Sequence, residues 1–175
     1  VKEDYAVKIY DNVDELMDDV DVIDIATPSL SHYYYAEKAL KKSKHVFMLA
    51  EAGNLDLYSV GFDELYAWTI MHAMTELYAG KKTVTQFDSL VNAEIAKYPQ
   101  RAYRLFFTSN HDENSWNGTE FEKYGDAYKT FAVFSQTMYQ SVPLIYNGQE
   151  DINKKRLKFF VKDTIPWEGE KEMEP

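Results

Sequence analysis

The sequence predicts an α/β fold in which a mostly parallel sheet of five or six strands has flanking helices. Short apolar segments bounded by polar residues alternate with amphipathic segments of about a dozen residues, and this alternation indicates repeated strand-helix units. The expected strands are residues 6–10, 20–26, 45–50, 104–109 and 143–146, with a sixth at 60–62. The expected helices are residues 31–44, 63–78, 87–97 and 125–139.

The number of strands decides between a closed barrel and an incomplete one. A closed eight-stranded βα barrel takes about 250 residues, whereas this chain has 175. We therefore expect either an open sheet or a partial barrel whose edges are covered by another chain. No Gly/Ser-rich or low-complexity linker interrupts the sequence, so the chain is expected to form one compact unit.

Composition argues against several classes of function. The 29 acidic residues outnumber the 19 basic ones, and the resulting charge of −10 would repel a nucleic acid. With no cysteine there is no disulfide, thiolate nucleophile or thiolate metal site. No segment approaches the roughly 20 apolar residues of a membrane span, and the charged start has no apolar signal region. We therefore expect a soluble chain that has no signal peptide and no membrane partner and that is a fragment of a longer protein. The cellular compartment is not predicted.

Polar residues follow three of the expected strands directly. Glu51 follows one strand, His111 and Asp112 follow another, and Gln149 follows a third. Because the carboxyl ends of parallel strands meet at one edge, the carboxyl groups of Glu51 and Asp112 should lie within about 10 Å of each other. Two carboxylates flanking a bond are what glycoside hydrolysis requires. Spacing alone leaves open the alternative that these are ordinary loop and helix-capping residues.

Four segments carry a resemblance to a known family. They are residues 46–51 (VFMLAE), 61–68 (GFDELYAW), 107–116 (FTSNHDENSW) and 143–150 (PLIYNGQE). With them, residues 46–173 resemble the C-terminal half, strands five to eight, of an α-amylase-family glycoside hydrolase. The resemblance implies a partial (β/α)8 barrel from a parent that hydrolyses α-1,4-glucans such as starch with retention. Such parents are often secreted or bound to the cell envelope.

The resemblance also implies a role for each residue of the expected rim. Glu51 stands where the family has its general acid/base, and Asp112 stands where it has its transition-state stabiliser. His111, Asn110 and Gln149 correspond to substrate-binding positions, so the expected ligand is an α-glucan or maltooligosaccharide.

Residues 1–45 carry a different resemblance, and we expect them to form a Rossmann-type βα segment that packs in one compact unit with the partial barrel of residues 46–175. Residues 21–28 (DVIDIATP) and 36–47 (AEKALKKSKHVF) resemble the nucleotide-binding domain of the glucose-fructose oxidoreductase and inositol dehydrogenase family. No Gly-x-Gly-x-x-Gly fingerprint precedes these strands, and the family's Glu-Lys-Pro is replaced by residues 49–51 (LAE), so no dinucleotide cofactor is expected. A chain that changes family near residues 44–47 is most simply a chimera, engineered or produced in sequence assembly.

The sequence does not reproduce the pattern that surrounds the catalytic nucleophile in the α-amylase family. The family places it on the fourth strand, two residues after an Arg. Here the strand in that position is 20–26, its nearest carboxylate is Asp24, and Val22 stands where the Arg belongs. We therefore expect an α-amylase-like fragment that is inactive by itself, with Asp24 as the one candidate nucleophile; the alternative is an inert chimeric or designed scaffold.

Two further expectations concern metals and assembly. No two of the four histidines share metal-ligand spacing with a carboxylate, so neither a metal site nor any cofactor is expected. Five or six parallel strands leave two unpaired edges with apolar faces. We expect a homodimer that joins these edges; the alternative is that residues 1–45 supply substitute strands.

Overall fold

The computed structural model describes residues 7–42 and 47–167. Contacts divide the chain into two units, Val1–Phe47 and Met48–Pro175, and each is considered by itself. Within the described ranges, none of the helices has the length and apolar character needed to span a membrane.

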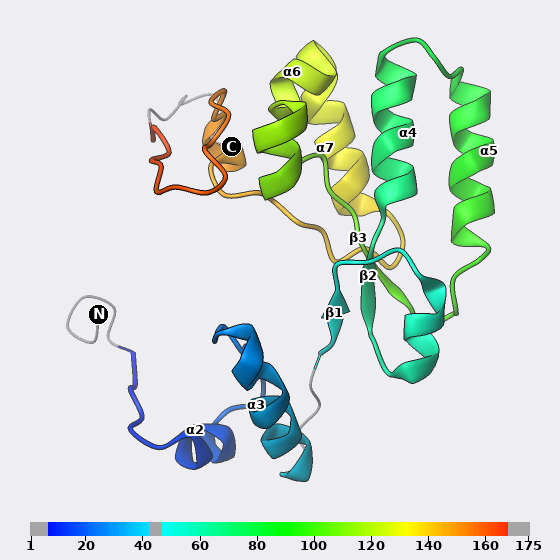
Figure 1. Cartoon of the computed structure of the whole chain (residues 1–175). Helices are drawn as coiled ribbons and strands as arrows, with labels where there is room; N and C mark the ends of the chain where they lie inside the picture. The colour runs from blue at the N-terminus through cyan, green and yellow to red at the C-terminus, as the bar shows by residue number, and fades with distance from the viewer. Residues whose placement is uncertain (1–6, 43–46, 168–175) are drawn as a thin grey trace. The chain divides into compact units, whose positions relative to one another are not determined.

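The smaller unit contains two helices, α2 (Val13–Asp19) and α3 (Ser29–Lys41) (Figure 1). The Asn12 side chain caps α2 by accepting a hydrogen bond of 2.8 Å from the backbone N–H of Asp14. Lys38 of α3 pairs with Asp14 at 2.6 Å, so an ion pair joins the two helices. Their packing buries one apolar side chain from each, Met17 and Ala39.

The strands expected at 6–10 and 20–26 are not formed by the described residues of these ranges, and residue 6 lies outside them. Residues 20–26 have no regular secondary structure between α2 and α3. The physical reason is the absence of a partner within the described part of this unit, because a strand is stable only when a neighbour satisfies its backbone N–H and C=O groups.

The larger unit contains a parallel sheet in the order β1 (Leu49–Ala50), β2 (Glu64–Tyr66), β3 (Tyr103–Leu105). Leu49 pairs with Glu64, and Glu64 pairs with Tyr103, so neighbours in the sheet follow each other in the sequence. This confirms the predicted α/β class with a parallel sheet, but the described residues form three strands instead of five or six.

Two of the expected strands are displaced or irregular. The strand expected at 60–62 lies at β2 instead, because Leu55–Val60 forms a 3-10 helix that Gly61 ends with a φ of 106°. Part of the strand expected at 143–146 runs beside β3: Leu144 N–H donates to the Phe106 carbonyl at 2.9 Å, and Arg104 forms an isolated parallel bridge with Ser141. A fourth segment therefore continues the sheet without a regular ladder.

The helices of the larger unit pack on the sheet and on one another. They are α4 (Trp68–Tyr78), α5 (Val84–Ile95), α6 (Glu120–Tyr124) and α7 (Tyr128–Thr137), with α4 and α5 side by side (Figure 1). The helix expected at 63–78 thus begins only after β2, and α6 was not expected. A continuous core joins these helices to the end of β3, and its fully buried members include Ile70, Met74, Phe106, Phe107 and Tyr124. This core fixes the point at which the chain leaves β3.

Candidate active site

Glu51 leaves the sheet at the end of β1. The chain turns at once, because Ala52 N–H donates to the Ala50 carbonyl at 2.8 Å. The backbone N–H of Tyr66, the last residue of β2, donates to the Ala52 carbonyl at 3.2 Å and holds this turn against the neighbouring strand. The Glu51 side chain is exposed at this rim of the sheet.

His111 and Asp112 follow β3 after a buried extended segment. Asn110 ends that segment, and its side-chain oxygen accepts a hydrogen bond of 2.8 Å from the backbone N–H of Glu113, which starts the helical turn Glu113–Asn117. The His111 ring stacks on Phe159, with ring centroids 5.6 Å apart and planes inclined by 23°. The turn and the stacking together determine where the His111 and Asp112 side chains point.

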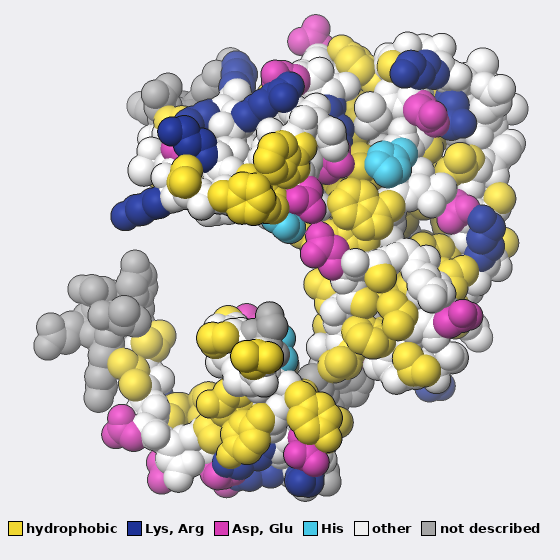
Figure 2. Space-filling view, viewed as in Figure 1, with side chains coloured by type: hydrophobic (Ala, Val, Ile, Leu, Met, Phe, Trp, Pro, Cys, Tyr) yellow, Lys and Arg dark blue, Asp and Glu magenta, His cyan; other side chains and the backbone are white. Residues whose placement is uncertain are grey.

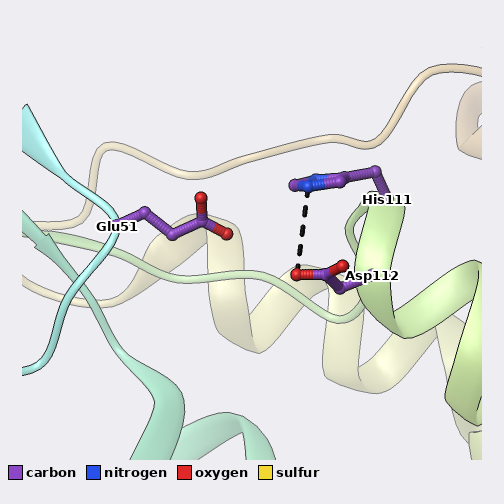
Figure 3. A group of neighbouring side chains, drawn as sticks. All are labelled: Glu51, His111 and Asp112. Carbon is purple, nitrogen blue, oxygen red and sulfur yellow. Dashed lines mark ion pairs between the residues drawn. The ribbon is translucent and has the colours of Figure 1, made fainter.

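The structure brings Glu51, His111 and Asp112 together. One carboxylate oxygen of each acid and one ring nitrogen of the histidine all lie within 4.8 Å of one another. The Glu51 carboxylate points toward His111 and Asp112, and His111 Nε2 lies 3.9 Å from Asp112 Oδ2 (Figure 3). The expected separation of the two carboxyl groups, under about 10 Å, is confirmed.

The two carboxylates make this rim electrostatically negative. The pKa of the neighbouring Tyr66 phenol is raised, mainly by burial and to a smaller extent by the negative charges of Glu51, Glu64 and Asp112. Among the described residues no Lys or Arg forms an ion pair with Glu51 or Asp112; the partner of Asp112 is His111. The rim is therefore suited to a ligand that carries positive charge or develops it during a reaction.

Exposed aromatic side chains adjoin the acidic rim. Trp116 is 57% exposed and Phe160 82%, and both pack on Phe159, with centroid distances of 5.4 and 4.7 Å. Phe159 in turn carries the His111 ring. Figure 2 shows apolar groups gathered beside acidic and histidine side chains on this face of the larger unit. Rings of this kind offer stacking surfaces for sugar rings.

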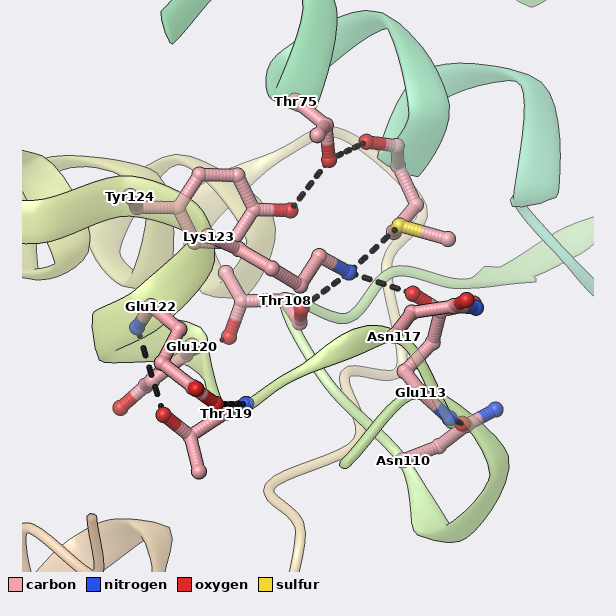
Figure 4. A network of polar contacts seen from close by, with 11 residues as sticks. Thr75, Thr108, Asn110, Glu113, Asn117, Thr119, Glu120, Glu122, Lys123 and Tyr124 are labelled. Atoms are coloured by element: carbon pink, nitrogen blue, oxygen red, sulfur yellow. Dashed lines mark hydrogen bonds and ion pairs between the residues drawn. The ribbon is translucent and has the colours of Figure 1, made fainter. Parts of the chain in front are cut away.

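A buried ion pair supports the turn that presents Asp112. Lys123 of α6 approaches Glu113 at 2.6 Å, and both side chains are less than 10% exposed (Figure 4). The Lys123 ammonium also donates to the Thr108 carbonyl at 3.4 Å. Burial lowers the pKa of Lys123, against the opposing effect of Glu113. The network ties the end of β3 to α6.

Gln149 and Asn110 lie close by but make internal contacts. The Gln149 amide donates to Thr108 Oγ1 at 2.6 Å and also to Glu120, and its oxygen accepts from Tyr146 N–H at 3.0 Å. Burial raises the pKa of Glu120 to about 6. Asn110 is 1% exposed, and its Nδ2 has no hydrogen-bond partner among the described residues. Their predicted contact with substrate stays a prediction.

Asp24 belongs to the other unit. It is exposed and lies in the irregular segment between α2 and α3. Its predicted role as a nucleophile stays untested.

The fold and the site define an α/β protein whose described residues form a parallel three-stranded sheet, with carboxylates beyond the carboxyl ends of its strands. In solved structures this fold is found in a noncanonic maltogenic α-amylase from Thermotoga neapolitana (TM-score 0.67, 21% identity, 91% of this chain and 40% of that one). It is also found in an α-amylase from Lactobacillus plantarum (TM-score 0.64, 21% identity, 81% and 37%). A third is the cyclic α-maltosyl-(1→6)-maltose hydrolase from Arthrobacter globiformis (TM-score 0.57, 15% identity, 79% and 33%). The chain thus spans well under half the length of these enzymes, and at these identities the likeness concerns the fold.

Residues 1–48 match a different family, the oxidoreductase family with an NAD-binding Rossmann fold. This match and the fold shared with α-amylases are consistent with a chimera of the two families. The sequence has no match among curated proteins.

The described residues of this segment do not fit a dinucleotide. Residues 7–42 contain no glycine that would let a pyrophosphate approach the backbone. At the start of α2 the Asn12 side chain already occupies the Asp14 N–H, and Asp14 and Glu15 would repel phosphate. No NAD chemistry is therefore derived from the match.

One grouping in the site was not anticipated from the sequence. The sequence analysis compared histidine spacings along the chain and expects no metal site, whereas the structure brings donor atoms of His111 and two carboxylates within 4.8 Å of one another. The available signal was the position of Glu51 and His111 at the ends of strands that share an edge.

Proposed function

We propose that this chain is an α-amylase-like glycoside hydrolase fragment that binds α-1,4-glucans at Glu51, His111 and Asp112 but does not hydrolyse them by itself. The observation that carries the proposal is the convergence of these three side chains, within 4.8 Å, at the carboxyl ends of β1 and β3. The fold shared with two α-amylases and a cyclic α-maltosyl-(1→6)-maltose hydrolase supports it.

Each of the three residues has a role that its chemistry allows. Glu51, when protonated, donates its proton to the leaving glycosidic oxygen, and the Asp112 carboxylate stabilises positive charge at the anomeric carbon. His111 donates a ring N–H to a sugar hydroxyl. Asn110 and Gln149 are proposed to contact the substrate, and their internal hydrogen bonds would hold them beside the rim.

Hydrolysis with retention also requires a nucleophilic carboxylate. In this sequence the candidate is Asp24, and Val22 stands where the amylase pattern has Arg. The larger unit therefore offers two of the three carboxylates that the reaction uses. Binding without turnover is the consequence.

The test is a titration with maltoheptaose, followed by NMR chemical shifts and calorimetry. We expect weak binding, with a Kd on the order of 1 mM, because half of a cleft buries half of the sugar contacts. Asp112→Asn and Trp116→Ala each weaken it several-fold. Asp88→Asn removes an equal charge from an exposed position of α5 and leaves binding unchanged.

The alternative is an inert chimeric scaffold. It predicts no chemical-shift change at Glu51 or His111 up to about 50 mM sugar, well above the weakest useful affinity. It also predicts that any shifts are as large in Asp112→Asn as in the unaltered chain. Either result would refute glucan binding and favour the interpretation of the chain as an inert scaffold.

A further inference from the structure

We propose that Glu51, His111 and Asp112 together form a binding site for a divalent transition-metal ion, with Zn²⁺ as the best match. This inference goes beyond glucan binding and does not depend on it. It starts from the convergence of two carboxylates and one imidazole at one point of the rim (Figure 3).

The three donor atoms lie up to about 1.4 Å farther apart than they would on a bound zinc ion. Two ligand atoms on one tetrahedral zinc, each about 2.1 Å from the metal, lie about 3.4 Å apart. His111 Nε2 and Asp112 Oδ2 are 3.9 Å apart, and all three donors lie within 4.8 Å of one another. Glu51 is exposed, so rotation of its side chain can supply most of the remaining approach without moving the backbone.

The charges at the rim favour a cation. Two ionised carboxylates contribute two negative charges, and no Lys or Arg in the described part of the chain pairs with either. A bound divalent ion would relieve the repulsion between the two acids.

The donor types select the kind of ion. Mg²⁺ and Ca²⁺ are bound by six or more oxygen atoms. An imidazole beside two carboxylates suits Zn²⁺, and three protein ligands leave a fourth position for water. Because the His111 ring is held by stacking on Phe159, part of the site is already ordered.

The experiment is a calorimetric titration of the tag-free chain with Zn²⁺ alone, with NMR of the histidine side chains and no sugar present. We expect one ion per chain, and at least a tenfold lower affinity for Zn²⁺ in His111→Gln and in Asp112→Asn. Replacing a residue that only hydrogen-bonds to a metal ligand already lowers metal affinity about tenfold or more, so loss of a ligand itself should cost at least as much. His72→Gln removes an exposed histidine of α4 and serves as the control. Ca²⁺ at the same concentration gives no comparable heat.

A structural effect of His111→Gln is separated from loss of a ligand by His111→Cys, which keeps a zinc ligand and is expected to retain binding. Circular dichroism checks that each variant is folded. The proposal is overturned if the unaltered chain binds no Zn²⁺ up to about 1 mM, or if His111→Gln binds as tightly as His72→Gln. These zinc titrations contain no sugar, and the maltoheptaose titration contains no zinc. A negative result in one experiment therefore leaves the other proposal standing.

Discussion

Replacing Lys123 by Met should destabilise the larger unit far more than loss of a surface ion pair. The Lys123 ammonium lies 2.6 Å from Glu113 in a pair whose side chains are 6% and 7% exposed. Met keeps most of the aliphatic length but removes the charge, so the Glu113 carboxylate is left buried with no cation beside it. Breaking a buried pair in this way costs about 3–5 kcal/mol.

A matched control is available on the same helix. Glu122 of α6 pairs with Arg156 at 2.8 Å, but these side chains are 49% and 47% exposed. Removing the charge with Arg156→Met is therefore expected to cost about 0–1 kcal/mol. The contrast between the two variants isolates burial, because both remove one cation from a pair with α6.

The assay is urea unfolding followed by tryptophan fluorescence. With a slope of about 1.5 kcal/mol per molar urea for a unit of this size, 3 kcal/mol corresponds to a midpoint about 2 M lower. The double variant Glu113→Gln/Lys123→Met should regain about 1 kcal/mol or more relative to Lys123→Met, because it buries no charge. The reasoning is refuted if Lys123→Met and Arg156→Met shift the midpoint equally, or if the double variant regains nothing.

Four further outcomes are expected. Burial raises the pKa of Glu64 to about 7, from 4.5. Between pH 4.5 and about 7, Glu64 therefore stays protonated in the folded state but not in the unfolded state. The free energy of unfolding should fall as the pH rises through this range. Urea titrations at several pH values should show a weaker fall for Glu64→Gln, which cannot titrate. Gly125 has a φ of 46° and a ψ of −132°, a conformation that L side chains rarely adopt, and a Cβ there would also collide with Tyr78 Oη. Gly125→Ala should therefore lower the Tm measured by calorimetry by at least about 5 °C, and Tyr78→Phe should restore only part of this loss. Release of reducing sugar from starch should not exceed that of the Glu51→Gln variant, because the nucleophile is unsupported, and a clear excess would contradict this. Sedimentation should detect a dimer joined through sheet edges at micromolar concentration; a monomer at high concentration would exclude it.

Much of the larger unit could be predicted from local sequence. The segments around β1 and β3, and the helices α4, α5 and α7, were placed within a few residues, because apolar periodicity directly reflects which face is buried. The start of α4 was misplaced because Leu65 and Tyr66 continue the apolar pattern of the helix that follows, whereas pairing with β1 and β3 draws Glu64–Tyr66 into the sheet. Tertiary pairing here overrides the local pattern.

The smaller unit shows the limit of the same reasoning. Residues 20–26 have an apolar, β-branched composition typical of a strand, yet the structure gives them no ladder. Composition measures how well a segment would fit into a sheet, but a strand exists only where another strand satisfies its hydrogen bonds. The sequence of residues 20–26 alone cannot show whether such a partner strand exists.

The sequence by itself determined the residue types of the candidate site and the strand ends on which Glu51 and Asp112 stand. Only the tertiary structure decided that their carboxylates and the His111 ring lie within 4.8 Å, while the Gln149 amide bonds to Thr108 in the interior. The physical reason is that strand pairing sets which chain ends are neighbours, whereas the direction of each side chain depends on turns and ring contacts formed by residues far away in the sequence. For His111 the contact is Phe159, 48 positions later in the chain.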